Sequence, residues 1–306
     1  MHVDWKGVYP ALTTKFTTAD ELDLPLFEKN LKAQLEAGVD GLILGGSLGE
    51  ASTLTNQEKE TLVKFAVEKV NGEVPVILNI AESSTRDALK QTENAEKWGA
   101  QGIMMLPPMR YSSDPRETVE YFTTVAHSTH LPIMIYNNPV DYKIEVTPAM
   151  FESLLQCDNI QAVKESTRDV TNVTRLRNRF GNRLKILCGV DTIAMEALMM
   201  GADGWVAGLV CAFPAETVAV YRLVKAGKIE EALQIQRWFL PLLELDIHPK
   251  LVQYIKLAEA QTGLGSEYVR APRLTLTGEE RERILSVIKK GVAARPKLSE
   301  YQLVPH

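Results

Sequence analysis

Eight short apolar runs, separated by segments of helical periodicity, are the feature that most constrains the fold of this 306-residue chain. Each run is almost continuously hydrophobic, which is typical of strands buried on both faces of a parallel sheet. Parallel strands need crossover connections, usually helices, so the alternation predicts a series of βα units. The runs cover residues 8–14, 41–46, 75–80, 102–107, 132–137, 160–165, 184–188 and 204–209.

Helix signals lie between most of these runs. Thr55 and Glu58 have the spacing of a capping box, in which each side chain bonds to the other residue's backbone. Pro148 suits a first helical position, and Gly181 and Gly201 suit helix ends. The expected helices are residues 24–36, 55–69, 84–98, 116–129, 147–155, 170–180 and 192–200.

Eight βα units predict an α/β fold of the closed (β/α)8 barrel type. A doubly wound open sheet is the alternative, but no glycine fingerprint for a dinucleotide opens the first helix. Beyond the eighth run the pattern is entirely helical, over residues 215–225, 229–245, 250–263 and 278–294. We therefore expect a barrel over residues 1–212 and a C-terminal helical appendage over 213–306, which would serve as a lid, a prop or a subunit contact.

Composition excludes several classes of partner. The formal net charge is −5 and no dense Lys/Arg block is present, so we expect neither nucleic acid nor an anionic membrane as partner. The most apolar stretch, residues 193–215, contains Glu196 and Asp203, so we do not expect it to span a membrane. The amino terminus lacks a signal-peptide pattern. The five histidines show no metal-ligand spacing, so we expect no metal site.

The cysteines favour a cytoplasmic location. They are odd in number and none has CxxC spacing, which suits reduced, buried thiols rather than a disulfide framework. The three are Cys157, Cys188 and Cys211.

Lys164, near the end of the sixth run, is the first candidate catalytic residue. An apolar setting lowers the pKa of a lysine, and a neutral amine attacks carbonyl and imine carbons. If the fifth and sixth strands are parallel neighbours, Tyr136 lies beside it and can shuttle protons. The alternatives are a strand-end lysine that reaches solvent or pairs with Glu165, and an interior tyrosine with a satisfied hydroxyl.

The glycine-rich segment 45–50 follows the second run. Glycines let a backbone approach a ligand closely, and consecutive amides can hold a carboxylate, with Ser47 as a proton relay. A simple tight turn is the alternative reading. Glu50 would cap or brace this loop. Further polar or small residues at the expected strand ends are Tyr111, Asn138, Gly189, Asp191 and Gly208.

Three short motifs carry a resemblance to a known family. They are Gly46-Ser47-x-Gly49-Glu50, Tyr136-Asn137-x-Pro139 and Val163-Lys164-Glu165-Ser166. In this order and spacing, the chain resembles the dihydrodipicolinate synthase/N-acetylneuraminate lyase family from about residue 7 through the helical tail. The resemblance implies a Schiff base between the barrel lysine and a 2-oxo acid, with no metal or organic cofactor.

The resemblance also implies roles for individual residues. Lys164 would be the nucleophile, Tyr136 the acid/base and Ser47 the relay, and the Ser47 and Leu48 amides would bind a carboxylate. The expected substrate-binding residues are Gly46, Leu48, Tyr111, Asn138, Gly189, Asp191 and Gly208. Members of the family are usually homotetramers built as dimers of dimers, so we expect the same assembly here.

Departures from the family pattern bear on the substrate. Ser47-Leu48 stands where the synthases have Thr-Thr, and Asp141 stands where they have a carboxylate-binding arginine. In the family a neighbouring subunit normally supplies a tyrosine from the loop after the fourth strand. Arg110 stands at that position here, and Tyr111 follows one residue later. Sialic acid lyases bind a long polyol with polar groups after the seventh and eighth strands. Thr192, Trp205 and Gly208 make this part of the barrel mouth less suited to such a substrate.

The signature Tyr136-Asn137-Asn138-Pro139-x-x-Tyr142, together with Ser47-Leu48-Gly49-Glu50, is most similar to a third branch, the 1-pyrroline-4-hydroxy-2-carboxylate deaminases. This predicts a Schiff-base deaminase that yields 2-oxoglutarate semialdehyde and ammonia. The alternatives are a pyruvate-dependent aldolase, of the 2-keto-3-deoxy sugar acid or N-acetylneuraminate type, and dihydrodipicolinate synthase. Two alternatives are more remote: a non-catalytic barrel that binds a small acid, and a metal-dependent hydrolase.

Overall fold

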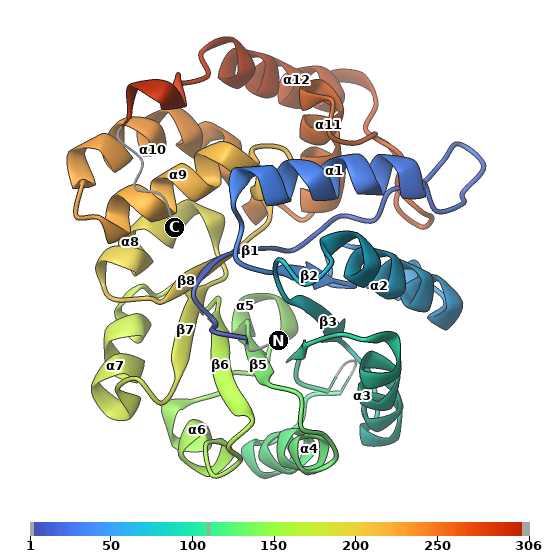
Figure 1. The fold of residues 1–306 in the computed structure, drawn as a ribbon, viewed down its shortest axis with the longest axis vertical. Helices are drawn as coiled ribbons and strands as arrows, with labels where there is room; N and C mark the ends of the chain where they lie inside the picture. Colours follow the sequence, from blue (N-terminus) through green and yellow to red (C-terminus); the bar gives the residue numbers. More distant parts are fainter. Residues whose placement is uncertain (1–2, 109–110, 302–306) are drawn as a thin grey trace.

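The eight apolar runs form eight parallel strands in the computed structural model, which describes residues 3–108 and 111–301. The strands are hydrogen-bonded in the order β1-β8-β7-β6-β5-β4-β3-β2. A parallel bridge between Ala11 and Ile43 joins the two ends of this series, so the sheet closes into the ring seen in Figure 1. The strands are β1 (Gly7–Pro10), β2 (Leu42–Leu44), β3 (Val76–Ile80), β4 (Gly102–Met105), β5 (Ile133–Asn137), β6 (Ile160–Glu165), β7 (Lys185–Cys188) and β8 (Gly204–Ala207).

An outer layer of helices surrounds this ring, so the predicted (β/α)8 barrel is confirmed. The strands are buried on both faces, which explains why they read as continuous apolar runs. The helices around the barrel are α1 (Leu24–Ala37), α2 (Asn56–Val70), α3 (Thr85–Trp98), α4 (Pro115–His127), α6 (Pro148–Leu154), α7 (Thr171–Phe180), α8 (Ala194–Met199) and α9 (Pro214–Lys225).

Local signals place most helix ends as expected. The Thr55–Glu58 capping box is present at the start of α2, and Pro148 is the first residue of α6. A short helix, α5 (Pro139–Tyr142), was not anticipated, because four residues are too few to show a helical period. The side chain of Asn138 caps it by accepting from the Asp141 amide at 3.2 Å.

The first strand is shorter than the expected 8–14. The backbone amides of Ala11 and Leu12 still bond to Ala207 and Ile43, but the side chains that follow bond elsewhere. Thr14 donates to the carbonyl of Gly49 at 2.6 Å, and Thr13 donates to Glu259 at 2.8 Å. This segment therefore links the barrel to the glycine-rich loop and to the C-terminal helices.

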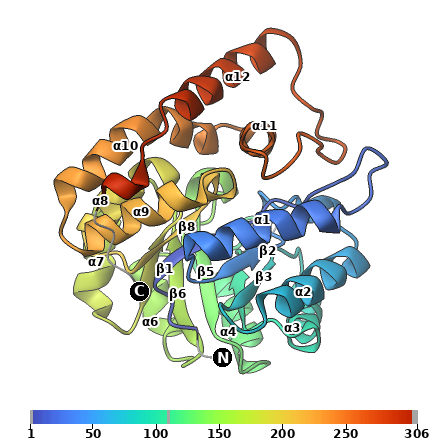
Figure 2. The ribbon, with the colours of Figure 1, turned by 45° about the horizontal axis from the view of Figure 1, so that its top comes forward.

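The C-terminal helices lie on one side of the barrel (Figure 2), where α10 packs against α9, and α12 packs against α10 and α11. They are α10 (Ile229–Leu243), α11 (Leu251–Thr262) and α12 (Gly278–Ala293). A 3-10 turn, η4 (Glu244–Ile247), joins α10 to α11 and packs against η2 (Asp191–Ile193), which follows β7. The tail therefore reaches the mouth of the barrel. α9 itself contacts β1, β8 and α1, and the division of the chain at residue 212 stays a prediction.

No helix within the described ranges is long and apolar enough to span a lipid bilayer.

Candidate active site

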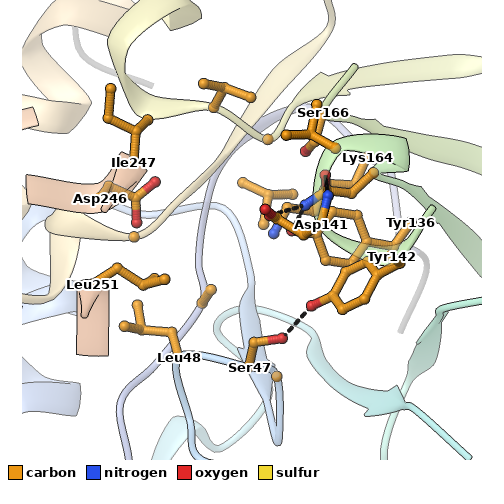
Figure 3. A pocket seen from close by; sticks show the side chains of 18 of the residues that line it. Ser47, Leu48, Tyr136, Asp141, Tyr142, Lys164, Ser166, Asp246, Ile247 and Leu251 are labelled. Carbon is orange, nitrogen blue, oxygen red and sulfur yellow. Dashed lines mark hydrogen bonds between the residues drawn. The ribbon is translucent and has the colours of Figure 1, made fainter. Parts of the chain in front are cut away.

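A pocket of about 510 Å³ opens at the carboxyl ends of the strands. Its walls come from the glycine-rich loop after β2, from β5 and α5, from β6, and from the segment that runs from η4 into α11 (Figure 3). Segments far apart in the sequence thus meet around one cavity, at the barrel face where enzymes of this fold hold their substrates.

Lys164 and Tyr136 lie side by side in this pocket. They are paired in the β5–β6 register, and the Lys164 Nζ lies 3.9 Å from the centroid of the Tyr136 ring. Lys164 is 7% exposed and Tyr136 is 9% exposed. Burial lowers the pKa of the Lys164 ammonium, against the opposing influence of Asp246 and Tyr142. The amine is therefore displaced toward its neutral, nucleophilic form.

Gly189, after β7, provides the space that Lys164 occupies. A Cβ at this position would lie 2.6 Å from both Cγ and Cε of Lys164, and 2.2 Å from Oγ of Ser166. No side chain larger than hydrogen fits there while the lysine keeps its place. Gly189 thus leaves the room that Lys164 needs, and its expected contact with substrate stays a prediction.

The Tyr136 hydroxyl is held by Asn138. The Asn138 amide donates to the Tyr136 Oη at 3.1 Å and to the Asp141 carboxylate at 2.7 Å. Burial raises the pKa of Tyr136, so the phenol keeps its proton in the free protein. A protonated phenol beside the lysine is available to donate a proton and, once it has done so, to accept one.

Ser47 forms a hydrogen bond with a second tyrosine, Tyr142. Its Oγ lies 2.5 Å from the hydroxyl of Tyr142, and the Tyr142 ring packs edge-on against Tyr136. Burial raises the pKa of Tyr142 to about 12. Within the described part of the chain, the backbone amides of Ser47 and Leu48 donate to no protein acceptor. Two free N–H groups beside a lysine are suited to a ligand carboxylate.

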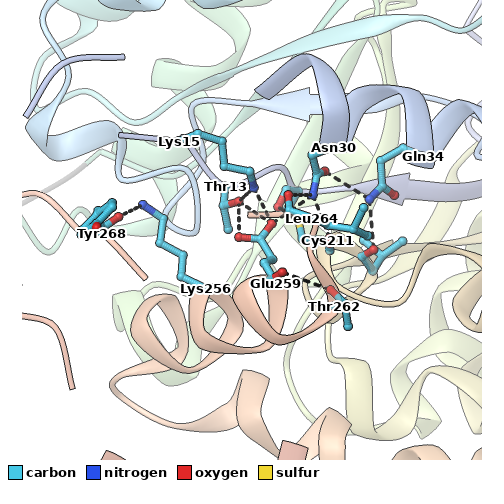
Figure 4. Close-up of polar contacts among 12 residues, drawn as sticks. Thr13, Lys15, Asn30, Gln34, Cys211, Lys256, Glu259, Thr262, Leu264 and Tyr268 are labelled. Atoms are coloured by element: carbon cyan, nitrogen blue, oxygen red, sulfur yellow. Dashed lines mark hydrogen bonds and ion pairs between the residues drawn. The ribbon is translucent and has the colours of Figure 1, made fainter. Parts of the chain in front are cut away.

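A buried ion pair with α11 holds the glycine-rich loop in place. Figure 4 shows the second contact of Lys256, with Tyr268, and the neighbouring pair of Lys15 and Glu259. The Lys256 ammonium donates to Glu50 at 2.5 Å and to the carbonyl of Tyr268 at 2.7 Å. Beside it, Lys15 pairs with Glu259, and all four charged side chains are at most 1% exposed. The expectation that Glu50 braces the loop therefore has a structural counterpart in α11.

Most of the residues expected at the site line the pocket. They are Gly46, Ser47, Leu48, Tyr136, Asn138, Lys164, Gly189 and Gly208.

Asp191 and Tyr111 are placed elsewhere. The Asp191 carboxylate is buried and accepts from Trp205 Nε1 at 2.9 Å and from the Leu209 amide at 2.8 Å. Tyr111 is 59% exposed and donates to Glu117. In this single chain neither residue lines the pocket, so their roles as substrate contacts stay predictions. Arg110 lies outside the described residues.

Tyr142, Arg168 and Asp246 are among the pocket residues that were not foreseen as site residues. Tyr142 belongs to the signature quoted above, so a signal for it was present. Arg168 has a left-handed backbone with φ of 65° and lies 4.0 Å from Asp141. Asp246 belongs to η4, and nothing in its local sequence predicts that this segment turns into the barrel mouth.

A search of the described residues finds no group of three or more His, Cys, Asp or Glu side chains arranged to hold a metal ion.

Comparison with known proteins places this site in a family. The model of the dihydrodipicolinate synthetase family matches residues 4–291. The chain belongs to this family. It is therefore a lyase of the class I aldolase type, which confirms the family and reaction class expected from the sequence.

The relatives cover nearly the whole chain. A 4-hydroxy-tetrahydrodipicolinate synthase of Exiguobacterium sibiricum is 34% identical over 275 residues, which is 89% of this chain and 92% of the relative. The prophage protein YagE of Escherichia coli K12, of the dihydrodipicolinic acid synthase family and solved in complex with pyruvate, superimposes with a TM-score of 0.88 at 26% identity. That match covers 94% of this chain and 98% of YagE.

A structure of a monomeric dihydrodipicolinate synthase variant matches equally well, with a TM-score of 0.88 at 26% identity. It covers 94% of this chain and 97% of that variant. None of these relatives is named as a deaminase, so the comparisons give no support to that branch.

Proposed function

We propose that this protein is a Schiff-base lyase in which Lys164 condenses with C2 of a small 2-oxo or cyclic 2-imino acid. The observation that carries the proposal is the Lys164 amine, buried 3.9 Å from the ring centroid of Tyr136 in a pocket with free backbone amides. That YagE was solved with pyruvate supports a 2-oxo acid as the ligand class.

The site residues divide the chemistry among them. The substrate carboxylate accepts from the Ser47 and Leu48 amides, which places C2 at the Lys164 nitrogen. The amine adds to C2, and Tyr136 protonates the oxygen or nitrogen that leaves. The resulting iminium withdraws electrons from C3, so a C3 proton is removed and an enamine forms. Ser47 and Tyr142 carry protons between this centre and solvent.

The first candidate reaction is that of the named relatives, the synthesis of 4-hydroxy-tetrahydrodipicolinate. The product contains the atoms of pyruvate and 2-amino-4-oxobutanoate less one water. A new carbon–carbon bond must therefore join the two, and the enamine of pyruvate would form it by attacking the aldehyde carbon. Arg168 lines the pocket and supplies a guanidinium for the second carboxylate. Overall sequence similarity favours this candidate.

The second candidate is the deamination of 4-hydroxy-1-pyrroline-2-carboxylate, and a specific observation favours it. Asp141 and Asp246 both line the pocket, so its wall carries two acidic side chains. Carboxyl groups suit a substrate whose far end is a hydroxyl or an amine, and the Asp141 carboxylate disfavours a second carboxylate beside it. Aldol cleavage of a 2-keto-3-deoxy acid would use the same enamine.

A comparison of three substrates on one preparation tests the proposal. Pyruvate with 2-amino-4-oxobutanoate reports synthesis, 4-hydroxy-1-pyrroline-2-carboxylate reports ammonia release, and a 2-keto-3-deoxy sugar acid reports aldehyde release. We expect turnover in one of these assays and its loss in Lys164→Ala. Turnover that survives this substitution would refute the Schiff-base assignment.

We also propose that the enzyme is cytoplasmic and assembles as a homotetramer. The support is the usual assembly of the family, and the monomeric variant described above is a known exception. Light scattering on the purified protein gives the mass directly, and a monomer would contradict the proposed assembly.

A further inference from the structure

Asp246 is a carboxyl group in the pocket to which the steps above assign no proton transfer. It is partly exposed because it faces the cavity, and Figure 3 shows its carboxyl on the wall opposite Lys164 and Tyr136. Its flanking pocket residues, Ile247 and Leu251, are apolar. It accepts a hydrogen bond from the Asp191 backbone amide, and within the described residues none to another side chain is found. Both carboxylate oxygens of Asp191 are engaged, by Trp205 and by backbone amides.

Gly208 allows Asp246 to take this position. A Cβ on Gly208 would lie 2.2 Å from Oδ1 of Asp246, so any other residue there would displace the carboxyl. The segment η4 is itself fixed by its packing against η2. The carboxyl thus lies against the backbone of Gly208, just after β8, in a space that a larger residue would fill.

The surroundings of Asp246 favour its neutral form. Burial raises its pKa well above the ordinary value, the Asp191 and Asp141 carboxylates act in the same direction, and Lys164 opposes them. A carboxylic acid that keeps its proton is a donor that can protonate a developing alkoxide or hydroxide.

We propose that Asp246 is the acid–base residue that exchanges a proton with the oxygen on C4 of the substrate. The inference rests on the function proposed above. With the C1 carboxylate on the Ser47 and Leu48 amides and C2 bonded to Lys164, C4 extends across the cavity toward the wall that carries Asp246. The site would accordingly select 2-oxo or 2-imino acids that bear, or acquire, a hydroxyl on C4.

In both leading reactions the proton of Asp246 goes to the oxygen on C4. In aldol addition the enamine C3 bonds to the aldehyde carbon, the carbonyl π electrons move to oxygen, and that oxygen takes the proton of Asp246. In dehydration the C4–O bond breaks as the enamine nitrogen donates its electron pair, and the oxygen leaves with the same proton as water. The Asp246 carboxylate then regains a proton from solvent through the open pocket.

Two readouts on Asp246→Asn test this role. Exchange of the pyruvate C3 protons with deuterium, followed by NMR, needs Lys164 and Tyr136 but involves no C4 oxygen. We expect this exchange to keep its plateau rate, with its midpoint moved to lower pH because Asp246 no longer raises the pKa of Lys164. Turnover of the full substrate falls at least about 100-fold, as for loss of a general acid. Glu244→Gln, an exposed acid on the same turn, is the matched control and keeps both.

The remaining outcomes overturn the inference. Unchanged turnover in Asp246→Asn means that the carboxyl handles no proton, and an equal loss of exchange and turnover means that it acts only through Lys164. If Asp246→Asn fails to fold, Asp246→Ser is measured by the same two readouts. Absence of exchange in the unaltered protein with every 2-oxo acid would instead refute the proposed function, and this inference with it.

Discussion

At the scale of the residue, the chemistry depends on one amine. A lysine in water is a poor nucleophile at neutral pH because its ammonium form dominates. Lys164 is buried, and its burial lowers its pKa more than the neighbouring acidic groups raise it. The Tyr136 ring beneath it and the Gly189 backbone behind it fix its direction.

The pH dependence of borohydride trapping follows from this. Below its pKa the amine is protonated and unreactive, so the rate rises with pH and levels off once the amine is neutral. Because the pKa of Lys164 is lowered, we expect the midpoint of this rise below the ordinary lysine value of 10.5. Single-turnover trapping with pyruvate across a pH series measures it. A midpoint at or above the ordinary value would contradict the account.

Gly189→Ala tests the space around the lysine. The added Cβ would overlap Cγ and Cε of Lys164, so the amine must move. We expect kcat to fall by about 100-fold, the cost of misplacing a reacting group by about 1 Å, while the thermal midpoint changes little. Steady-state kinetics and thermal melts on one preparation give both values.

Gly201→Ala is the matched control and should give the reverse pattern. Gly201 follows α8 with φ of +101°, and nothing lies within 4 Å of an added Cβ. Alanine in this backbone conformation costs roughly 1–3 kcal/mol of folding free energy, with kcat retained. A stability loss in Gly189→Ala as large as its activity loss would show that the glycine serves folding alone.

The sequence predicted the central pair but not its partners. Lys164 and Tyr136 were identifiable because each ends a strand, and strand register then places them together. Asp191 shares that kind of position, yet its carboxylate turns to Trp205 and Leu209. Which way a strand-end side chain turns depends on partners distant in sequence, and a local pattern does not contain them.

At the scale of the element, α11 acts as a brace behind the glycine-rich loop. Lys256 and Glu50 form a fully buried ion pair, and burial lowers the pKa of Lys256 to about 8. A buried charge left without its partner is strongly destabilising, whereas an exposed pair contributes little. The loop that offers its amides to the substrate is therefore anchored by a helix far along the chain.

Glu50→Gln should lower the free energy of unfolding by about 3 kcal/mol, because it leaves the Lys256 ammonium buried without a carboxylate. Adding Lys256→Met should restore part of this loss. Urea unfolding curves provide the measurement. Glu60→Gln, in an exposed pair with Lys64, serves as control and should leave the curve unchanged. Equal effects at the buried and exposed pairs would count against the bracing role.

The short helix α5 places a hydroxyl where the barrel strands do not. Tyr142→Phe removes the partner of Ser47 Oγ. We expect kcat to fall by about tenfold, equivalent to one hydrogen bond of about 1.4 kcal/mol, with KM nearly constant because the substrate carboxylate is bound by backbone amides. Tyr301→Phe, outside the pocket, is the control. A rise in KM alone would assign Tyr142 to binding rather than to proton relay.

At the scale of the whole molecule, the barrel was predictable because its signal repeats. Each βα unit carries its own apolar run and helix pattern, so eight weak local signals support one architecture. The position of η4 was not predictable, because it depends on how α10 and α11 pack outside the barrel. That packing brings Asp246 to the mouth, and it gives the helical tail a part in the site.

The most direct test of the central claim is borohydride reduction in the presence of pyruvate, followed by peptide mass mapping. The account predicts one adduct, on Lys164, with the mass of pyruvic acid less one oxygen atom, and none in Lys164→Ala. A protein that turns over its substrate but yields no adduct, or one that carries the adduct on another lysine, would contradict it.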